Sequence, residues 1–240
     1  MHADSPDKPN PSRRDVWRMF DRIAHRYDLL NHLLSLNRDI AWRKRLTRHL
    51  PDRTDQNVLD LATGTGDQLL AVFHSGRVKA GTGIDLADKM LEVGREKIAR
   101  AGLASSLTLE HGDAEKIPFD DNTFDALSIS FGIRNVIDVP HALEEMRRVL
   151  NPGGRALILE FSLPGNGLLR ALYLIYFRNI LPRLGAMISG DRDAYRYLNQ
   201  TVESFPYGEA FCRLMRDAGL VNVKATPFTF GIATLYQGDK

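Results

Sequence analysis

The chain is poor in cysteine. Its 240 residues contain a single one, Cys212, so no disulfide can form within the chain, and we expect a reducing compartment, the cytoplasm. It also lacks an excess of one charge: 32 Lys and Arg stand against 30 Asp and Glu, a net charge of +2. This balance creates no overall field that would call for a nucleic-acid partner. The histidines are scattered singly, and we expect no metal site.

A long apolar segment without charges is also missing. The most apolar stretch, residues 168–189, carries three arginines and Pro182, which argues against a helix that spans a membrane. We expect two amphipathic helices that meet near Pro182. Residues 1–12 are polar and rich in proline and lack the apolar core of a signal peptide, so they are expected to form a disordered tail.

What the chain does have is a regular alternation of strand-like and helical patterns. Strands are expected at 57–63, 80–86, 106–112, 124–131, 155–161, 221–228 and 231–237, with helices at 67–74, 87–102 and 140–150. This alternation predicts an α/β fold with a Rossmann-like, seven-stranded and mostly parallel sheet. Only a few residues separate the last two strands, so they should form an antiparallel C-terminal hairpin.

The hydrophobic content of 43% is enough for one core, and we expect a single domain over residues 13–240. Two helical regions lie outside the alternating pattern. Residues 13–50 are expected to cover the cofactor end of the sheet, and residues 164–205 to form a lid. Open α/β sheets bind ligands outside the carboxyl ends of their strands, so both regions can build a substrate chamber.

The most informative motif follows the first expected strand. Residues 60–67, Asp-Leu-Ala-Thr-Gly-Thr-Gly-Asp, predict a tight glycine turn that opens a helix. About twenty residues after Gly64, the second strand ends in Asp85, where a carboxylate can accept both ribose hydroxyls of an adenosine. The NAD fingerprint would need glycine at Leu69, so a dehydrogenase is disfavoured. The spacing fits the loop of S-adenosylmethionine (SAM) methyltransferases, with Ala62 in place of the first glycine.

Polar residues at two further strand ends extend this site. Asp113 and Ala114 follow the third strand, where a carboxylate and a backbone amide can bind adenine; a simple turn cap explains Asp113 equally well. Ser130 ends the fourth strand, close to the methionine half of such a cofactor. Arg134 and Asn135 come next, at the rim where a substrate would react, although Arg134 can also be read as a surface ion-pair partner.

These residues together resemble the ubiquinone/menaquinone biosynthesis C-methyltransferases. The similarity lies in residues 27–31, Leu34-Ser35, Trp42, residues 120–125, residues 130–135, residues 148–154 with 160–162, and residues 189–198. It spans roughly residues 16–238. Three positions depart from the family pattern: Asp39 replaces a usual histidine, Asn151 a usual lysine, and Asp113 an asparagine found in some members.

The resemblance implies SAM as the cofactor. It implies that Gly64 and Thr65 contact the methionine part, Asp85 the ribose, Asp113 and Ala114 the adenine, and Ser130 the region near the sulfonium. The acceptor would be a ring carbon of a prenylated quinol, either demethylmenaquinol or 2-methoxy-6-polyprenyl-1,4-benzoquinol.

For this reaction a quinol hydroxyl with a pKa of about 10 must ionise. We expect Arg134 to stabilise the oxyanion as a fixed cation, and Asn135 to position the hydroxyl or a water.

Residues 168–189 would form the groove for the prenyl tail at the inner membrane surface, with arginines toward lipid phosphates. A helix pair packed on the core is the alternative for this segment. A homodimer is also expected. Two other functions stay open: a SAM-dependent methyltransferase of another lipid or small molecule, and a methyltransferase fold that binds a ligand without catalysis.

Overall fold

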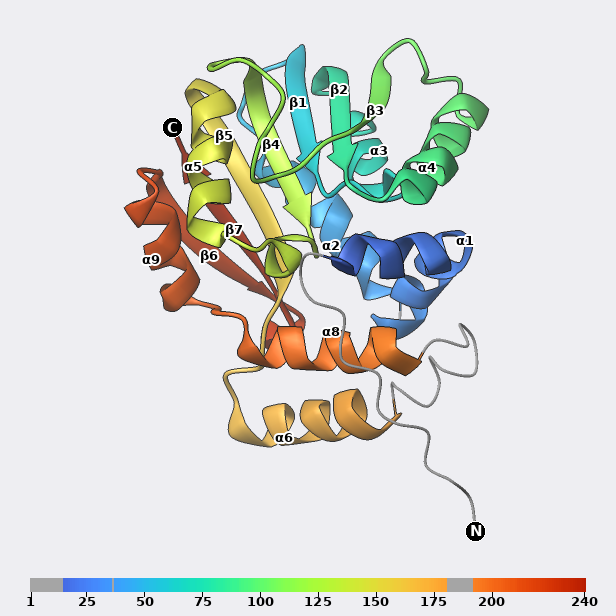
Figure 1. Ribbon diagram of the computed structural model, residues 1–240. Coiled ribbons are helices and arrows are strands. Elements are labelled where there is room, and N and C mark those ends of the chain that lie inside the picture. The colour runs from blue at the N-terminus through green and yellow to red at the C-terminus, as the bar shows by residue number, and fades with distance from the viewer. Residues whose placement is uncertain (1–14, 36, 181–191) are drawn as a thin grey trace.

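The computed structural model describes residues 15–35, 37–180 and 192–240. Across these residues a seven-stranded sheet has the order β3-β2-β1-β4-β5-β7-β6 (Figure 1). The strands are β1 (Gln56–Leu61), β2 (Val78–Asp85), β3 (Leu107–His111), β4 (Phe124–Ser130), β5 (Leu150–Phe161), β6 (Val221–Phe228) and β7 (Ala233–Asp239). Strand β7 is antiparallel to both β5 and β6. The five neighbouring strands β3, β2, β1, β4 and β5 are parallel to one another. The predicted fold class is confirmed.

Six of the strands begin and end within two residues of the predicted positions, but β5 begins earlier. Its first residue is Leu150, directly after the helix that ends at Val149, whereas the predicted start is residue 155. The turn at Gly153, which has a φ of 75°, stays within the strand, and the register against β4 shifts between Phe124 and Ala126. A glycine with a positive φ usually marks a turn where a strand ends. Here Gly153 forms an irregularity within β5 instead.

Helices cover both faces of the sheet. On one face lie α2 (Arg38–Leu46), α3 (Asp67–Phe73) and α4 (Asp88–Arg100), whose apolar residues pack with those of the strands in one core. On the other face lie α5 (Val139–Val149) and α9 (Glu209–Asp217), which contribute to a second core. Each helix buries one apolar stripe, as the periodicity predicts.

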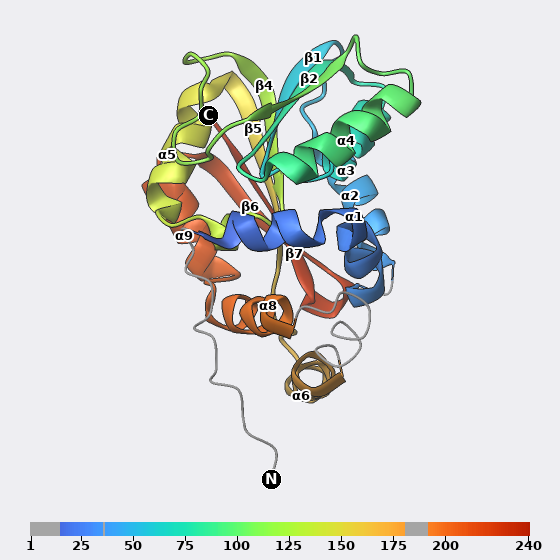
Figure 2. The same ribbon diagram turned by 45° about the vertical axis from the view of Figure 1, so that its right-hand side comes forward.

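Three more helices lie beyond the carboxyl ends of the parallel strands. Both views show α1 (Val16–Leu34) nearest to the strand ends, then α8 (Arg192–Ser204), then α6 (Gly167–Ile175) (Figures 1 and 2). A π-helical segment, η4 (Tyr176–Ile180), extends α6. The expected tail at 1–12 and the expected helix after Pro182 lie outside the described residues. None of the described helices is both long and apolar enough to cross a membrane.

Candidate active site

A cavity of about 310 Å³ lies at the carboxyl ends of β1, β2 and β4, within the size range of small-molecule sites. Six of the predicted site residues line it: Gly64, Asp85, Asp113, Ala114, Ser130 and Asn135. Helix α1 covers it with Val16, Trp17, Phe20 and Tyr27. The order of the strands therefore gathers residues that are far apart in the sequence around one space.

Asp85 is held in a fixed orientation by the backbone. Its Oδ2 accepts a hydrogen bond from the amide of Gly64 and its Oδ1 accepts one from the amide of Ala87, both at 2.8 Å. Burial raises the pKa of Asp85, and these two hydrogen bonds oppose that rise. Each carboxylate oxygen keeps a second lone pair, so the side chain fits the two hydroxyls of a ribose.

Gly64 shows why the loop needs glycine at this point. Its φ is 57°, and a Cβ there would lie 3.2 Å from Cε of Met90 and 3.9 Å from the ring of Tyr27. A side chain would therefore be strained and would fill the space between the loop and α1. Without one, a ligand can approach the backbone of the loop.

The adenine end of the cavity combines one carboxylate with apolar side chains. Asp113 accepts a hydrogen bond from the amide of Glu115 at 2.9 Å, so it caps the turn and lines the cavity at the same time. Ala114, Leu86 and Val136 provide apolar walls beside it. This composition suits a flat aromatic base with a polar edge, and together with Asp85 and Gly64 it fits SAM.

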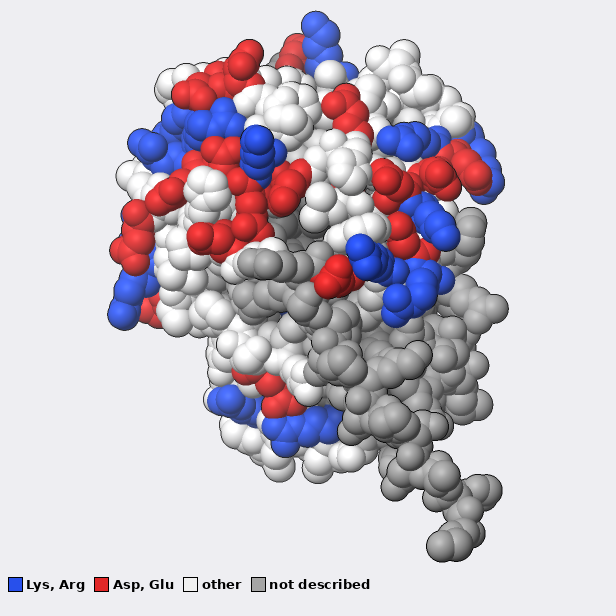
Figure 3. All heavy atoms as spheres, in the orientation of Figure 1, with Lys and Arg blue, Asp and Glu red and all other residues white. Residues whose placement is uncertain are grey.

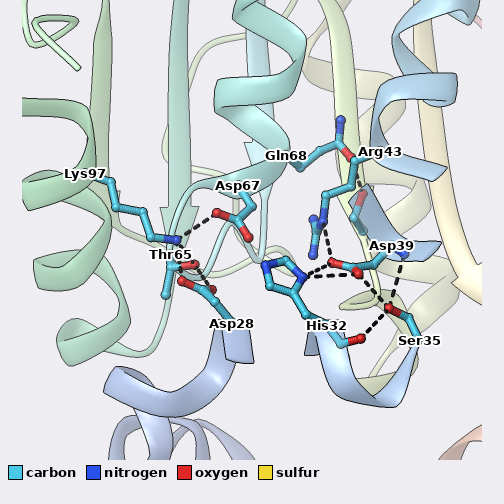
Figure 4. Close-up of polar contacts among 10 residues, drawn as sticks. Asp28, His32, Ser35, Asp39, Arg43, Thr65, Asp67, Gln68 and Lys97 are labelled. Atoms are coloured by element: carbon cyan, nitrogen blue, oxygen red, sulfur yellow. Dashed lines mark hydrogen bonds and ion pairs between the residues drawn. The ribbon is translucent and has the colours of Figure 1, made fainter. Parts of the chain in front are cut away.

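Thr65 is not among the residues that line the cavity, and its contact with the methionine part stays a prediction. Its hydroxyl donates to Oδ1 of Asp28 on α1 at 2.6 Å and accepts from Nζ of Lys97 on α4 at 2.9 Å (Figure 4). Lys97 also pairs with Asp28 and with Asp67. The hydroxyl thus fastens α1 to the glycine loop.

Arg134 differs from its prediction. It lies on η3 (Ile133–Asn135), directly after β4, and only 5% of it is exposed, so it does not stand at the rim. Its Nη1 donates to Oε1 of Glu160 at 2.7 Å and to the carbonyl of Phe131 at 2.5 Å. Because Glu160 compensates its charge, Arg134 is not an unpaired cation that faces a substrate.

Asn135, the next residue, does line the cavity. The hydroxyl of Tyr197 on α8 donates to its Oδ1 at 3.2 Å, which orients the amide. The same helix that packs beyond the strand ends therefore positions a predicted site residue.

Sequence reasoning missed three residues of this region: Tyr27, Glu160 and Tyr197. Burial raises the pKa of Tyr27, while the side chain of Asn31 and the charges of Arg134 and Arg43 oppose the rise. Its hydroxyl is therefore protonated at neutral pH and can donate a hydrogen bond in the cavity. All three stand in segments that resemble the similar family, residues 27–31, 160–162 and 189–198, and that resemblance was the signal.

The fold and the site define a class. A glycine loop after β1, an acidic residue at the end of β2 and a mostly parallel sheet with an antiparallel last strand are those of a SAM-dependent methyltransferase. A SAM-dependent methyltransferase from Thermotoga maritima superposes with a TM-score of 0.66 at 18% identity, covering 93% of this chain and 99% of the other. At that identity the likeness concerns the fold alone.

The sequence comparisons lead further. A model of the ubiE/COQ5 methyltransferase family matches residues 8–240. A demethylmenaquinone methyltransferase of Bacteroides fragilis is 40% identical over 225 residues, 94% of this chain and 92% of the relative. One of Thermus thermophilus is 43% identical over 222 residues, 92% of this chain and all of the relative. The chain belongs to the ubiE/COQ5 methyltransferase family, and its cofactor is SAM.

Proposed function

We propose that this protein transfers the methyl group of SAM to a ring carbon of a prenylated quinol. The acceptor is demethylmenaquinol, which becomes menaquinol, or 2-methoxy-6-polyprenyl-1,4-benzoquinol. The observation that carries the proposal is the cavity on Asp85 and Gly64 in a chain whose demethylmenaquinone methyltransferase relatives match it over nearly their whole length. Gly64, Asp85, Asp113, Ala114 and Ser130 hold the cofactor.

The cofactor supplies an electrophilic methyl group. The protein must make the ring carbon a nucleophile, which requires a neighbouring hydroxyl to ionise. Asn135 and Tyr27 both line the cavity and carry hydrogen-bond donors, so they bind and stabilise the developing oxyanion. Arg134 acts by position: its pair with Glu160 fixes the segment that carries Asn135. The aromatic and apolar side chains of α1 exclude water.

The membrane is the second proposed partner, since a prenylated quinol dissolves in the bilayer. The protein works in the cytoplasm at the inner surface, with α1 and residues 164–205 as the cover and lid of its single domain. Leu168, Leu172 and Ile175 of α6 are exposed by 72%, 56% and 56% and have the spacing of one helix face. Arg178, expected to face lipid phosphates, instead pairs with Glu203. The homodimer stays a prediction, which size-exclusion chromatography with light scattering tests.

The function is tested by incubating the purified protein with methyl-deuterated SAM and each reduced quinol in detergent. Mass spectrometry should find a product heavier by one deuterated methyl group, with the label on a ring carbon. Asp85→Ala, which removes a cofactor contact, serves as the inactive control. Label in a different lipid or small molecule would support the first alternative. SAM binding without transfer to any acceptor in a lipid extract would support a non-catalytic binding protein.

A further inference from the structure

Arg43 is a buried cation that is poorly satisfied within the protein. It lies on α2 and is 8% exposed. Its Nε has no hydrogen-bond partner among the described residues. The carboxylate that pairs with it is that of Asp39, whose Oδ2 is 3.9 Å from Nε, beyond hydrogen-bond distance. Buried charges are normally paired closely, because an unpaired one loses its hydration without compensation.

Asp39 is occupied by other partners. The hydroxyl of Ser35 donates to its Oδ1 at 2.6 Å, and Nδ1 of His32 lies 3.0 Å from its Oδ2 (Figure 4). Asp39 is only 2% exposed, so these contacts hold it in place. The carboxylate therefore offsets part of the charge of Arg43 from a distance and leaves its N–H groups for another acceptor.

The surroundings place Arg43 beside the cofactor cavity. Its guanidinium lies 5.4 Å from the ring centre of Phe131, which lines the cavity, and its charge acts on the hydroxyl of Tyr27, which lines it too. A second buried donor stands nearby: Nε2 of Gln68 also lacks a partner among the described residues. The hydroxyl of Ser130, another cavity residue, donates to Oε1 of Gln68 at 2.9 Å and so fixes that amide.

Neither donor lines the cavity itself, but each contacts a residue that does: Arg43 the ring of Phe131 and Gln68 the hydroxyl of Ser130. Both contacts lie at the end of β4, whereas Asp85 and Asp113 stand at the ends of β2 and β3. Guanidinium and amide N–H groups select an anionic oxygen. We propose that Arg43 binds the carboxylate of the methionine part of SAM, with Gln68 in support. The proposal rests on the cofactor stated above and adds a residue that carries no earlier role. The alternative anionic group for Arg43 is the ionised oxygen of the quinol.

Calorimetric titration with two ligands tests the proposal. Decarboxylated SAM lacks only the carboxylate, so the wild-type protein should bind SAM at least about tenfold more tightly than this analogue. In Arg43→Met the Kd for SAM should rise by that factor, while the Kd for decarboxylated SAM stays within twofold. Because both ligands are titrated into the same variant, partial misfolding alters both constants and cannot imitate the expected change.

Lys44→Met is the matched control. It removes a positive charge from the next position of α2, where the side chain is exposed, and should leave both constants unchanged. Arg43→Lys should keep part of the preference for SAM, since it keeps the charge but not the planar donor pair. Equal weakening of both ligands in Arg43→Met, or no weakening, would overturn the proposal.

The kinetics of methyl transfer separate the two sources of the anionic oxygen. If Arg43→Met binds SAM normally but raises the KM for the quinol, Arg43 serves the quinol oxygen and the carboxylate assignment is wrong. Each of these results in the Arg43 variants differs from a failure of the proposed function. In that case the wild-type protein itself would not bind SAM or would not methylate a quinol.

Discussion

Asp60 lies near the end of β1, directly below the glycine loop, and 1% of it is exposed. Two hydroxyls donate to it: that of Thr63 to Oδ2 at 2.7 Å and that of Ser128 to Oδ1 at 2.6 Å. Burial raises its pKa from 3.8 to about 6, although both hydrogen bonds oppose the rise. Asp60 therefore connects β1, β4 and the loop, and its ionisation at neutral pH costs stability.

This cost predicts that the stability of the folded protein depends on pH. The folded state holds the proton of Asp60 more tightly than the unfolded chain does, so its contribution to stability rises as the pH falls from 7 through 6 toward 4. Between pH 7 and pH 5 the gain is roughly 1 kcal/mol. Urea unfolding of wild type and Asp60→Asn at both pH values should show their difference in free energy changing by that amount. Glu96→Gln, which changes an exposed carboxylate on α4 that pairs with Arg100, should show no such change; an equal change there would contradict the argument.

At the scale of single residues, sequence reasoning located the cavity residues that stand at the ends of strands. Asp85 and Ser130 line the cavity because each is the last residue of a strand, and Asp113 because it follows β3 by two residues; periodicity locates these strand ends. It did not identify the partners that position a side chain from another element. Arg134 meets Glu160 from the neighbouring strand, and Thr65 meets Lys97 from another helix; these contacts depend on tertiary packing, which no local pattern specifies.

At the scale of elements, η3 is the segment that carries Asn135 into the cavity. Strand β5 anchors it through Glu160, which accepts from Nη1 of Arg134 and also from the backbone amides of Arg134 and Phe161. Glu160 is 1% exposed. The end of β5 therefore determines where η3 lies, although Glu160 itself does not line the cavity.

Glu160→Gln should weaken this anchor. It leaves the buried guanidinium of Arg134 without its counter-charge, which costs about 3 kcal/mol or more in unfolding free energy. Because Asn135 loses its fixed position, kcat should fall at least about tenfold, while the Kd for SAM stays unchanged. Stability from urea unfolding, kcat and calorimetry are measured on the same preparation. Glu209→Gln, which removes the charge that pairs with Arg216 at the surface, should leave the stability close to that of the wild type. Loss of SAM affinity in Glu160→Gln would show instead that the cofactor site has collapsed.

The elements themselves were the most predictable level. The strands follow from alternation and the helices from apolar stripes, so most boundaries agree with the sequence. The positions of α1 and α8 do not follow from periodicity, because an amphipathic helix shows only that one face is buried, not against what. Their place beyond the strand ends depends on contacts such as Asp28 with Thr65 and Tyr197 with Asn135.

At the scale of the whole molecule, two surfaces differ in character. On the face that Figure 3 shows, acidic and basic side chains are interspersed, and neither sign covers a large area. By contrast, α6 exposes four large apolar residues, Leu168, Leu169, Leu172 and Ile175, and Phe230 at the turn between β6 and β7 is 80% exposed. A second cavity of about 620 Å³ lies between α6 and this turn, with Leu163, Leu169 and Pro227 in its wall. Contact with a bilayer would therefore rest on apolar burial more than on charge.

Vesicle binding tests this account of the membrane surface. Leu168→Ser with Leu172→Ser should reduce co-sedimentation with lipid vesicles by roughly tenfold or more, because each buried leucine contributes about 1.5–3 kcal/mol. The same variant should methylate a short-chain, water-soluble quinol at the wild-type rate, since α6 lies away from the cavity on Asp85. Ile40→Ser with Val221→Ser replaces two apolar residues of similar exposure, 53% and 54%, outside this surface and should sediment like wild type.

Because the attraction is apolar, wild-type binding should persist when salt is raised to the point where exposed charges are screened. Binding that is lost in salt but retained in the leucine variant would place the contact on basic residues instead of α6.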